Sequence, residues 1–121
     1  MPWNGSIIEN FNWLPANDPC ALELGNGWRL PTNSEWLNVF WVNGGNWMDW
    51  TGSWNTGLKL HAAGCLDYSN GSLRGLGSNG YYWSYAQPNT TLAWSLHFDS
   101  GSNGVYTYNK SYGFSVRCIR N

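Results

Sequence analysis

Charged side chains and long apolar runs are both scarce in this chain, and each absence excludes a class of partner. Only 11% of the 121 residues are charged and the net charge is −1, so no basic surface is predicted for nucleic acid or an anionic membrane. No apolar run approaches the roughly 20 residues of a membrane span. The first residues also lack the basic and apolar regions of a signal peptide. We therefore expect neither nucleic-acid binding nor membrane insertion.

Cysteine is also sparse, and the motifs of common catalytic sites are missing. The three cysteines, Cys20, Cys65 and Cys118, lack the clustered spacing of a zinc site and allow one disulfide bond with one free thiol. Cys65 has no basic neighbour in the sequence, so a small buried side chain is expected rather than a nucleophile. No HExxH, CxxC or GxSxG motif and no phosphate-binding loop occurs. We expect no metal and no cofactor.

Aromatic residues are what the chain has in excess. It contains 10 Trp and 7 Tyr, while its polarity comes mainly from uncharged Asn, Ser, Thr and Gly. Trp and Tyr bury large areas and also carry a polar group, which suits both a core and a contact surface. The composition therefore predicts a packed domain in which some of the rings remain available for binding.

The N-terminal third predicts an irregular arm followed by one well-marked helix. Residues 1–19 are expected to form an arm that lies across the body, and residues 20–121 a single domain. A helix is predicted over about 33–43, with Thr32 as its N-cap and Glu35 completing a capping box. Gly44 and Gly45 follow as its end. The capping role accounts for Glu35 better than a role as a general acid.

The C-terminal third predicts antiparallel strands. Residues 44–80 have no sustained period and are expected to form a long ordered loop. After them, the segments YYWSYA, LAWSLHFD, VYTY and GFSVRCIR have the aromatic content and alternation of strands, with Asn103-Gly104 as the hairpin turn. The fold class is therefore α+β, with one main helix, long loops and an antiparallel sheet.

Alternation along residues 92–99 separates a core side from an outward side. Leu96 and Phe98 share the inward parity, while Ser95, His97 and Asp99 share the outward one. These three residues resemble a triad by type, but neighbours on one strand seldom give the geometry of a proton relay. We therefore expect no enzyme here. A display of aromatic and short polar side chains for binding is the alternative.

Four blocks in order carry a family resemblance: GNGWRLPTNSEW, LGSNGYYWS, AWSLHFDSGS and NKSYGFSVRCIRN. From about Asp18 to the C-terminus, the chain resembles the Fibrobacter succinogenes major paralogous domain family of the C-type-lectin-like group. It also resembles the C-type-lectin-like variable proteins of diversity-generating retroelements. The resemblance implies terminal strands close together and a variable binding region at about 81–112. The ligand-binding positions it implies are Tyr85, Gln87, Asn89, Ser95, His97, Asp99, Tyr106, Tyr108, Asn109 and Tyr112.

Three departures limit this resemblance. Cys65 stands where the family usually has Tyr, and the paired catalytic cysteines of the related formylglycine-generating enzyme have no match. Gln87-Pro88-Asn89 is similar to the calcium- and sugar-binding tripeptide of true lectins. Its Trp-Asn-Asp partner is missing, however, because residues 94–96 are Trp-Ser-Leu. Lys110 matches the ordinary family ending and is expected to be scaffold. Terminal strands lying close together would bring Cys20 and Cys118 within reach of a disulfide bond.

The leading hypothesis is a non-enzymatic ligand-recognition domain, the variable protein of a bacterial, archaeal or viral diversity-generating retroelement. One alternative is an ordinary paralogous cell-surface module of the adhesion type, whose face is fixed. A second is a degenerate relative of the formylglycine-generating enzyme. The expected partner is a protein or another cell-surface macromolecule, because a broad face suits those ligands. The expected location is the cell surface, the extracellular space or a virion, and the oligomeric state stays open.

Overall fold

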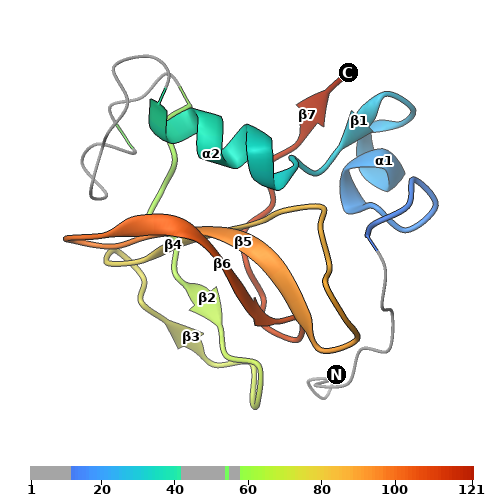
Figure 1. Cartoon of the computed structure of the whole chain (residues 1–121). Coiled ribbons are helices and arrows are strands. Elements are labelled where there is room, and N and C mark those ends of the chain that lie inside the picture. The colour runs from blue at the N-terminus through green and yellow to red at the C-terminus, as the bar shows by residue number, and fades with distance from the viewer. Residues whose placement is uncertain (1–11, 42–53, 55–57) are drawn as a thin grey trace.

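The structure, a computed structural model, describes residues 12–41, 54 and 58–121. It is a mixed fold of helix and antiparallel sheet in which strands predominate. Helix α2 (Asn33–Trp41) lies on one side of a three-stranded sheet, and a short hairpin of β2 (Cys65–Leu66) and β3 (Leu73–Arg74) lies on the other (Figure 1). This arrangement confirms the predicted α+β class at the level of its elements.

The three-stranded sheet consists of β4 (Gly80–Trp83), β5 (Leu92–Phe98) and β6 (Asn103–Asn109), all antiparallel, with β5 in the centre. Leu96 lies opposite Tyr82 of β4 and Val105 of β6. Because residues opposite one another point to the same side of a sheet, this register determines the two faces of the whole sheet.

The turn between β5 and β6 differs from the predicted one. Asn103 and Gly104 begin β6, so placing the turn at Asn103-Gly104 was wrong. The chain turns at residues 99–102, where the Asp99 carboxylate accepts hydrogen bonds from the backbone N–H groups of Gly101 and Ser102, each at 2.9 Å. An aspartate that satisfies the turn's own donors specifies the reversal without an Asn-Gly pair. The Tyr106 ring lies over Gly104, since a Cβ atom at this position would come within 2.6 Å of the end of that exposed side chain.

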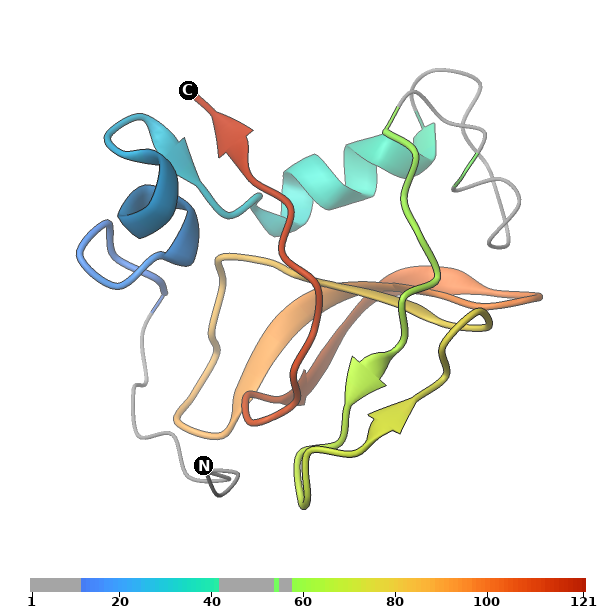
Figure 2. The ribbon, with the colours of Figure 1, turned by 180° about the vertical axis from the view of Figure 1, so that it is seen from behind.

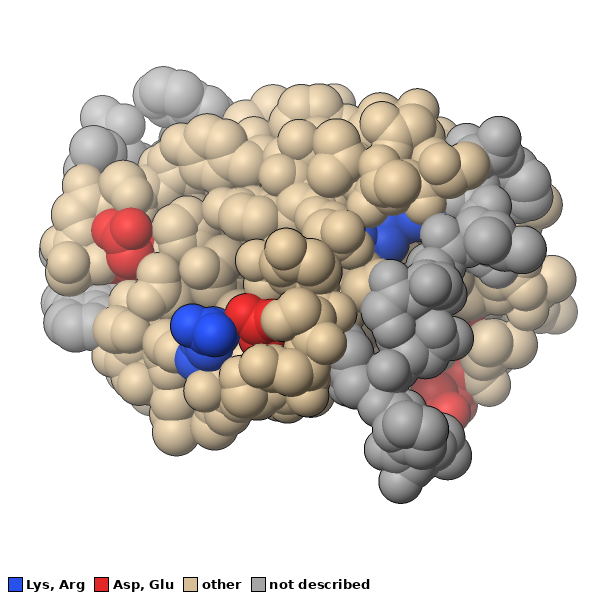
Figure 3. Space-filling model, turned by 90° about the horizontal axis from the view of Figure 1, so that it is seen from below, with Lys and Arg blue, Asp and Glu red and all other residues tan. Residues whose placement is uncertain are grey.

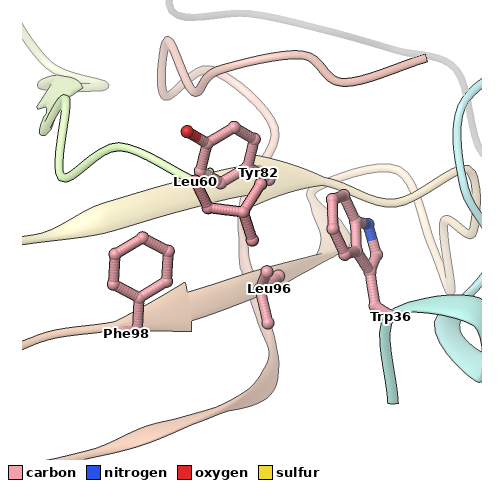
Figure 4. Close-up of a cluster of buried hydrophobic side chains, with 5 residues drawn as sticks. All are labelled: Trp36, Leu60, Tyr82, Leu96 and Phe98. Carbon is pink, nitrogen blue, oxygen red and sulfur yellow. The ribbon is translucent and has the colours of Figure 1, made fainter. Parts of the chain in front are cut away.

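The core lies between the sheet and α2. Trp36, Leu60, Tyr82, Leu96 and Phe98 form one buried cluster (Figure 4). Leu96 and Phe98 are fully buried, which confirms the predicted inward parity of β5. A Cβ atom at Gly80 would overlap the Phe98 ring, so close packing explains the glycine that begins β4.

The capping box predicted for α2 is present. The backbone N–H of Thr32 donates to Glu35 Oε2 at 2.8 Å, and the backbone N–H of Glu35 donates to Thr32 Oγ1 at 3.2 Å. Arg29 also donates to both carboxylate oxygens of Glu35, at 2.8 and 2.7 Å. These hydrogen bonds lower the pKa of Glu35 to about 2, with that from Arg29 contributing most. Residues 42–45, which include the predicted helix end, lie outside the described residues.

Two elements were not predicted. Helix α1 (Pro19–Leu24) begins after Asp18, whose buried carboxylate accepts from the backbone N–H groups of Cys20 at 2.8 Å and Leu30 at 2.9 Å. Asp as N-cap and Pro at the first helical position are start signals that the sequence does contain. The β2–β3 hairpin lies within the expected long loop, so the expectation of an irregular segment was wrong for residues 65–74.

The two ends of the domain are joined twice. Strand β1 (Trp28–Arg29) pairs antiparallel with β7 (Ile119–Arg120), and beside this pair Cys20 forms a disulfide bond with Cys118. Their Cα atoms are 5.5 Å apart and 98 positions separate them in the sequence. The proposed disulfide and the expected closeness of the terminal strands are therefore confirmed, and Cys65 is left as a buried free thiol.

Removing the disulfide should lower the free energy of unfolding by about 3–5 kcal/mol, because the bond closes a long loop in the unfolded chain. Denaturant unfolding of the wild type and of a Cys20→Ser/Cys118→Ser variant measures the difference. Reductant should destabilise the wild type and leave the variant unchanged. Titration of every cysteine as a free thiol in denatured, unreduced protein would contradict the assignment.

Candidate functional site

The side of the sheet that points away from α2 is called the outer face here. The strand register places on it Tyr81 and Trp83 from β4, Ser95 and His97 from β5, and Gly104, Tyr106 and Tyr108 from β6. It therefore combines predicted binding residues from two strands with two aromatic residues of β4 that were not predicted as binding residues. Figure 3 shows this side of the molecule, where β2 and β3 lie, as a largely uncharged surface on which a basic and an acidic group lie side by side and the other charged groups lie apart.

Part of the outer face is covered by residues 113–121, called the C-terminal segment here. Ser115 forms a parallel bridge with β4. Its backbone N–H donates to the carbonyl of Tyr81 at 3.0 Å, and its carbonyl accepts from the backbone N–H of Trp83 at 3.1 Å. This places the Phe114 ring 4.6 Å from Tyr81 and 4.2 Å from Trp83, stacked on both. The C-terminal segment therefore lies along the free edge of β4 and adds an aromatic ring to this face.

Ser95 is the clearest correction to the predicted site. It shares the outward parity, yet its exposed fraction is 0% and its Oγ has no hydrogen-bond partner among the described residues. Ser95 lies opposite Trp83 and Tyr106 in the sheet. Ser95 is buried although its parity is outward, so the parity of a strand residue gives the direction of its side chain and not its exposure.

Gln87 is a second correction, because it is 4% exposed. Its Oε1 accepts from the ammonium of Lys110 at 2.9 Å, and Lys110 is itself buried, in keeping with its expected scaffold role. Asn89 is exposed, and its Oδ1 accepts from the backbone N–H groups of Thr91 and Leu92, each at 2.9 Å. Protein donors therefore occupy the oxygens that a lectin-like calcium site would need. Nowhere in the described part of the chain do three His, Cys, Asp or Glu residues gather to hold a metal.

Tyr85 lies against the N-terminal arm. Asn12 donates its amide to the Tyr85 hydroxyl at 3.1 Å, and the backbone N–H of Trp13 donates to the Tyr85 carbonyl at 3.1 Å. Asn12 also accepts from the backbone N–H of Gln87 at 2.9 Å. The described end of the arm therefore crosses residues 85–87 as expected, and Tyr85 and Gln87 contact the arm.

His97, Tyr108 and Tyr112 belong to one aromatic cluster with Tyr81 and Phe114, called the ring cluster here. Asp99 lies in the turn that follows β5. Asn109 is a further correction, because it lies opposite Leu92 on the inner side of the sheet, where its Oδ1 accepts from the backbone N–H of Ser111 at 2.9 Å. His97 stacks on Tyr81 at 4.6 Å between centroids, and Phe114 stacks on Tyr112 at 5.3 Å. Tyr108 meets Tyr81 edge-on at 5.6 Å and Phe114 at 5.3 Å. Contacts of this kind add to area burial and hold the rings in place. Tyr106 stands beside the cluster with 48% of its surface exposed.

Burial changes the acid–base properties of the ring cluster. It lowers the pKa of His97, and the nearby Asp99 carboxylate opposes that change. The amide of Asn79 lies 3.2 Å from His97 Nε2, so the neutral imidazole can accept that hydrogen bond at Nε2. Burial also raises the pKa of Tyr108 to about 12, helped by the neighbouring phenols of Tyr81, Tyr106 and Tyr112.

The residues of the suspected triad do not form a proton relay. Asp99 bonds within its own turn, His97 bonds to Asn79, and Ser95 Oγ has no partner among the described residues. A nucleophile must reach its base within hydrogen-bond distance. Ser95, His97 and Asp99 are therefore not arranged as a nucleophile, its base and an orienting acid in the described structure.

A small pocket of about 190 Å³ opens at the ring cluster. Its lining combines the rings of Tyr81, Tyr108, Tyr112 and Phe114 with the polar side chains of Cys65, Arg74 and Asn79. Burial raises the pKa of the Cys65 thiol, which disfavours the reactive thiolate. A few polar groups within an aromatic lining are typical of a binding site.

Several pocket residues were missed at the sequence level, and the signals for them differ. Tyr81 could have been found, because an inward Tyr82 requires its neighbours to point outward. Arg74 and Asn79 lie in the segment expected to be a loop, and Phe114 reaches the pocket only because Ser115 pairs with β4. No local pattern marks those three residues.

The Tyr108 hydroxyl should titrate near pH 12 in the folded protein, since its folded pKa lies well above the ordinary value of 10.0. Folding therefore favours the protonated phenol, and this stabilisation is lost as the pH rises from about 10 towards 12. Phenolate absorbance across an alkaline titration measures it. The titration step at the highest pH should be missing in Tyr108→Phe. In the denatured wild type, this step should move to a pH of about 10. An unchanged curve in the variant would contradict the burial of this hydroxyl.

Neither helix of the described residues is long and apolar enough to cross a bilayer. Comparison with curated proteins and with solved structures gives no match. A family model described as a domain of unknown function, DUF8237, matches residues 42–119, which include the β2–β3 hairpin, the sheet and the pocket residues. The chain therefore belongs to this DUF8237 family.

Proposed function

We propose that this chain is a non-enzymatic ligand-recognition domain of the C-type-lectin-like kind that binds a macromolecular partner through its outer face. The observation that carries the proposal is the ring cluster. Aromatic and short polar side chains from β4, β5, β6 and the C-terminal segment meet around one pocket, whose lining includes one charged residue, Arg74. Rigid rings beside adjustable polar groups are the composition of a binding surface.

The frame behind this face supports a recognition role. The sheet is packed on the core cluster on its inner side, and the Cys20–Cys118 bond and the β1–β7 pair hold the two ends of the domain. A preorganised surface loses little conformational freedom on binding, which favours affinity. The disulfide also favours an oxidising location such as the cell surface, the extracellular space or a virion. The proposed partner is a protein or another cell-surface macromolecule.

We further propose that the chain is the variable protein of a diversity-generating retroelement. The corrected set of variable positions leaves out the buried Ser95 and Gln87, and Tyr85, which contacts the arm. Asn109 is left out as well, because it lies opposite Leu92 on the inner side of the sheet. The positions that remain are Asn89, His97, Asp99, Tyr106, Tyr108 and Tyr112. Most of them lie on or beside β5 and β6, where a change of side chain leaves the backbone pairing of the sheet intact.

One observation favours the alternative of a cell-surface module with a fixed face. His97, Tyr108 and Tyr112 are packed against the rings of Tyr81 and Phe114, and such contacts limit which residues can replace them. The coding sequence separates the two cases. A nearby reverse transcriptase gene and a near-copy of the segment for residues 81–112, differing at adenines, would establish diversification. Their absence leaves the fixed-face module.

The outer face should tolerate diversity that the residues beneath it do not. A library randomised at Tyr106 and Tyr112 should consist mainly of folded variants, because these side chains are exposed or half-buried. A matched library at Ser95 and Gln87 should lose most of its folded members, because those side chains are buried. The melting temperatures of sampled clones measure the difference.

The first library should also yield binders when it is displayed and selected against a panel of purified proteins. Loss of folding in both libraries at equal frequency would contradict a display surface. Folded variants that never bind any member of the panel would contradict the recognition role of this face. The parent chain, carried through the same selection, is the control for non-specific capture.

A further inference from the structure

The outer-face pocket combines one cationic group with an aromatic lining. We propose that it binds a carboxylate group of the ligand, carried on a compact apolar stem. The inference rests on the proposed function, because it names the chemistry of the group that the recognition face holds.

Charge complementarity favours an anion. Of the eight residues that line the pocket, Arg74 is the charged one. Its Nε forms an ion pair with Asp67 Oδ2 at 2.7 Å, and no described residue hydrogen-bonds its two terminal nitrogens. The Arg74 side chain is 62% exposed. A guanidinium held at Nε keeps the edge formed by Nη1 and Nη2 for a second, bidentate acceptor, and a carboxylate fits that edge.

Asp67 acts as a positioning residue for Arg74 and is not itself part of the pocket lining. Its other oxygen, Oδ1, accepts from the backbone N–H of Ser69 at 2.9 Å and from the Ser69 hydroxyl. These hydrogen bonds lower the pKa of Asp67, with that from the Ser69 hydroxyl contributing most, so it stays ionised at neutral pH. Both Asp67 oxygens are therefore engaged by protein donors. Its charge anchors one edge of Arg74, and the other edge remains for the ligand.

The remaining groups of the pocket suit the rest of such a ligand. The phenols of Tyr81, Tyr108 and Tyr112 have raised pKa values, so at neutral pH each is a hydroxyl that can donate a hydrogen bond. The rings of the same residues and of Phe114 offer apolar surface for a stem. At about 190 Å³, the pocket has room for one side chain or a similar small group. The carboxylate therefore belongs to an anchoring group of a larger partner.

Benzoate and its uncharged analogue benzamide provide the test, because they share a ring and differ in charge. The folded full chain is titrated with each compound, and binding is measured from the shifts of its tyrosine ring signals in NMR spectra. Benzoate should bind saturably and shift the signals of Tyr81, Tyr108 and Tyr112. Benzamide should bind at least about tenfold more weakly, because it cannot form the charged bidentate pair. Added salt should weaken benzoate binding and leave benzamide binding unchanged.

Arg74→Gln should weaken benzoate binding about tenfold or more. Arg74→Lys should recover only part of the lost affinity, because Lys keeps the positive charge but lacks the two parallel N–H donors of a guanidinium. Arg120→Gln is the matched control. Arg120 is also exposed but lies in β7, paired with β1 and outside the pocket lining. Melting temperatures verify that each variant is folded. If Arg74→Gln unfolds, the proposal is tested on the wild type alone, by comparing the affinities for benzoate and benzamide and by measuring how salt changes the affinity for benzoate.

Three results would overturn the proposal: no saturable binding of benzoate, equal binding of benzamide, or unchanged benzoate binding in a folded Arg74→Gln variant. The proposed function has a separate outcome in the outer-face library. Binders from that library without benzoate binding would remove only the carboxylate pocket. If benzoate binds but the library yields no binders, the pocket binds small acids and the proposal of a macromolecular recognition face is contradicted.

Discussion

The C-terminal segment is the constraint on which the rest of this structure depends. Gly113 exchanges backbone hydrogen bonds with Leu66 at 2.8 and 3.0 Å, Ser115 pairs with β4, Cys118 is bonded to Cys20, and β7 pairs with β1. One extended stretch therefore ties the β2–β3 hairpin, the sheet and the first helix together (Figure 2). Backbone pairing and a covalent bond depend little on side-chain identity nearby, so the frame can keep its shape while the outer face changes.

The same segment determines what the outer face can offer. Phe114 extends the aromatic surface past the edge of β4 and packs on Tyr81, which in turn stacks on His97. The pocket forms where this surface meets Arg74 of the β2–β3 hairpin. It is therefore assembled from three parts of the chain that are far apart in sequence. Each part contributes one kind of group: rings from the sheet, a ring from the C-terminal segment, and a cation from the hairpin.

Local signals in the sequence predicted the elements better than the surface. The capping box at Thr32 and Glu35 and the inward parity of Leu96 and Phe98 depend on neighbours within a few positions, and both are confirmed. The predicted position of the turn was wrong because the Asp99 carboxylate accepts hydrogen bonds within residues 99–102 and places the turn before the Asn-Gly pair. The exposure predicted for Ser95 was wrong because it was based on the parity of one strand, whereas Ser95 lies in the middle of the central strand, between Trp83 and Tyr106, and is fully buried. Parity is a property of one strand, whereas exposure depends on what the rest of the chain places above it.

Under the proposed diversification, the pocket would join fixed and variable parts of one site. Arg74, Tyr81 and Phe114 belong to the frame, whereas Tyr108 and Tyr112 belong to the proposed variable positions. A cation on the frame would keep a preference for one kind of anchoring group. Changes around it would alter the neighbouring contacts and hence the identity of the partner. Because specificity is a difference between affinities, such a division lets one part of the site supply a common anchor while the other part supplies the discrimination.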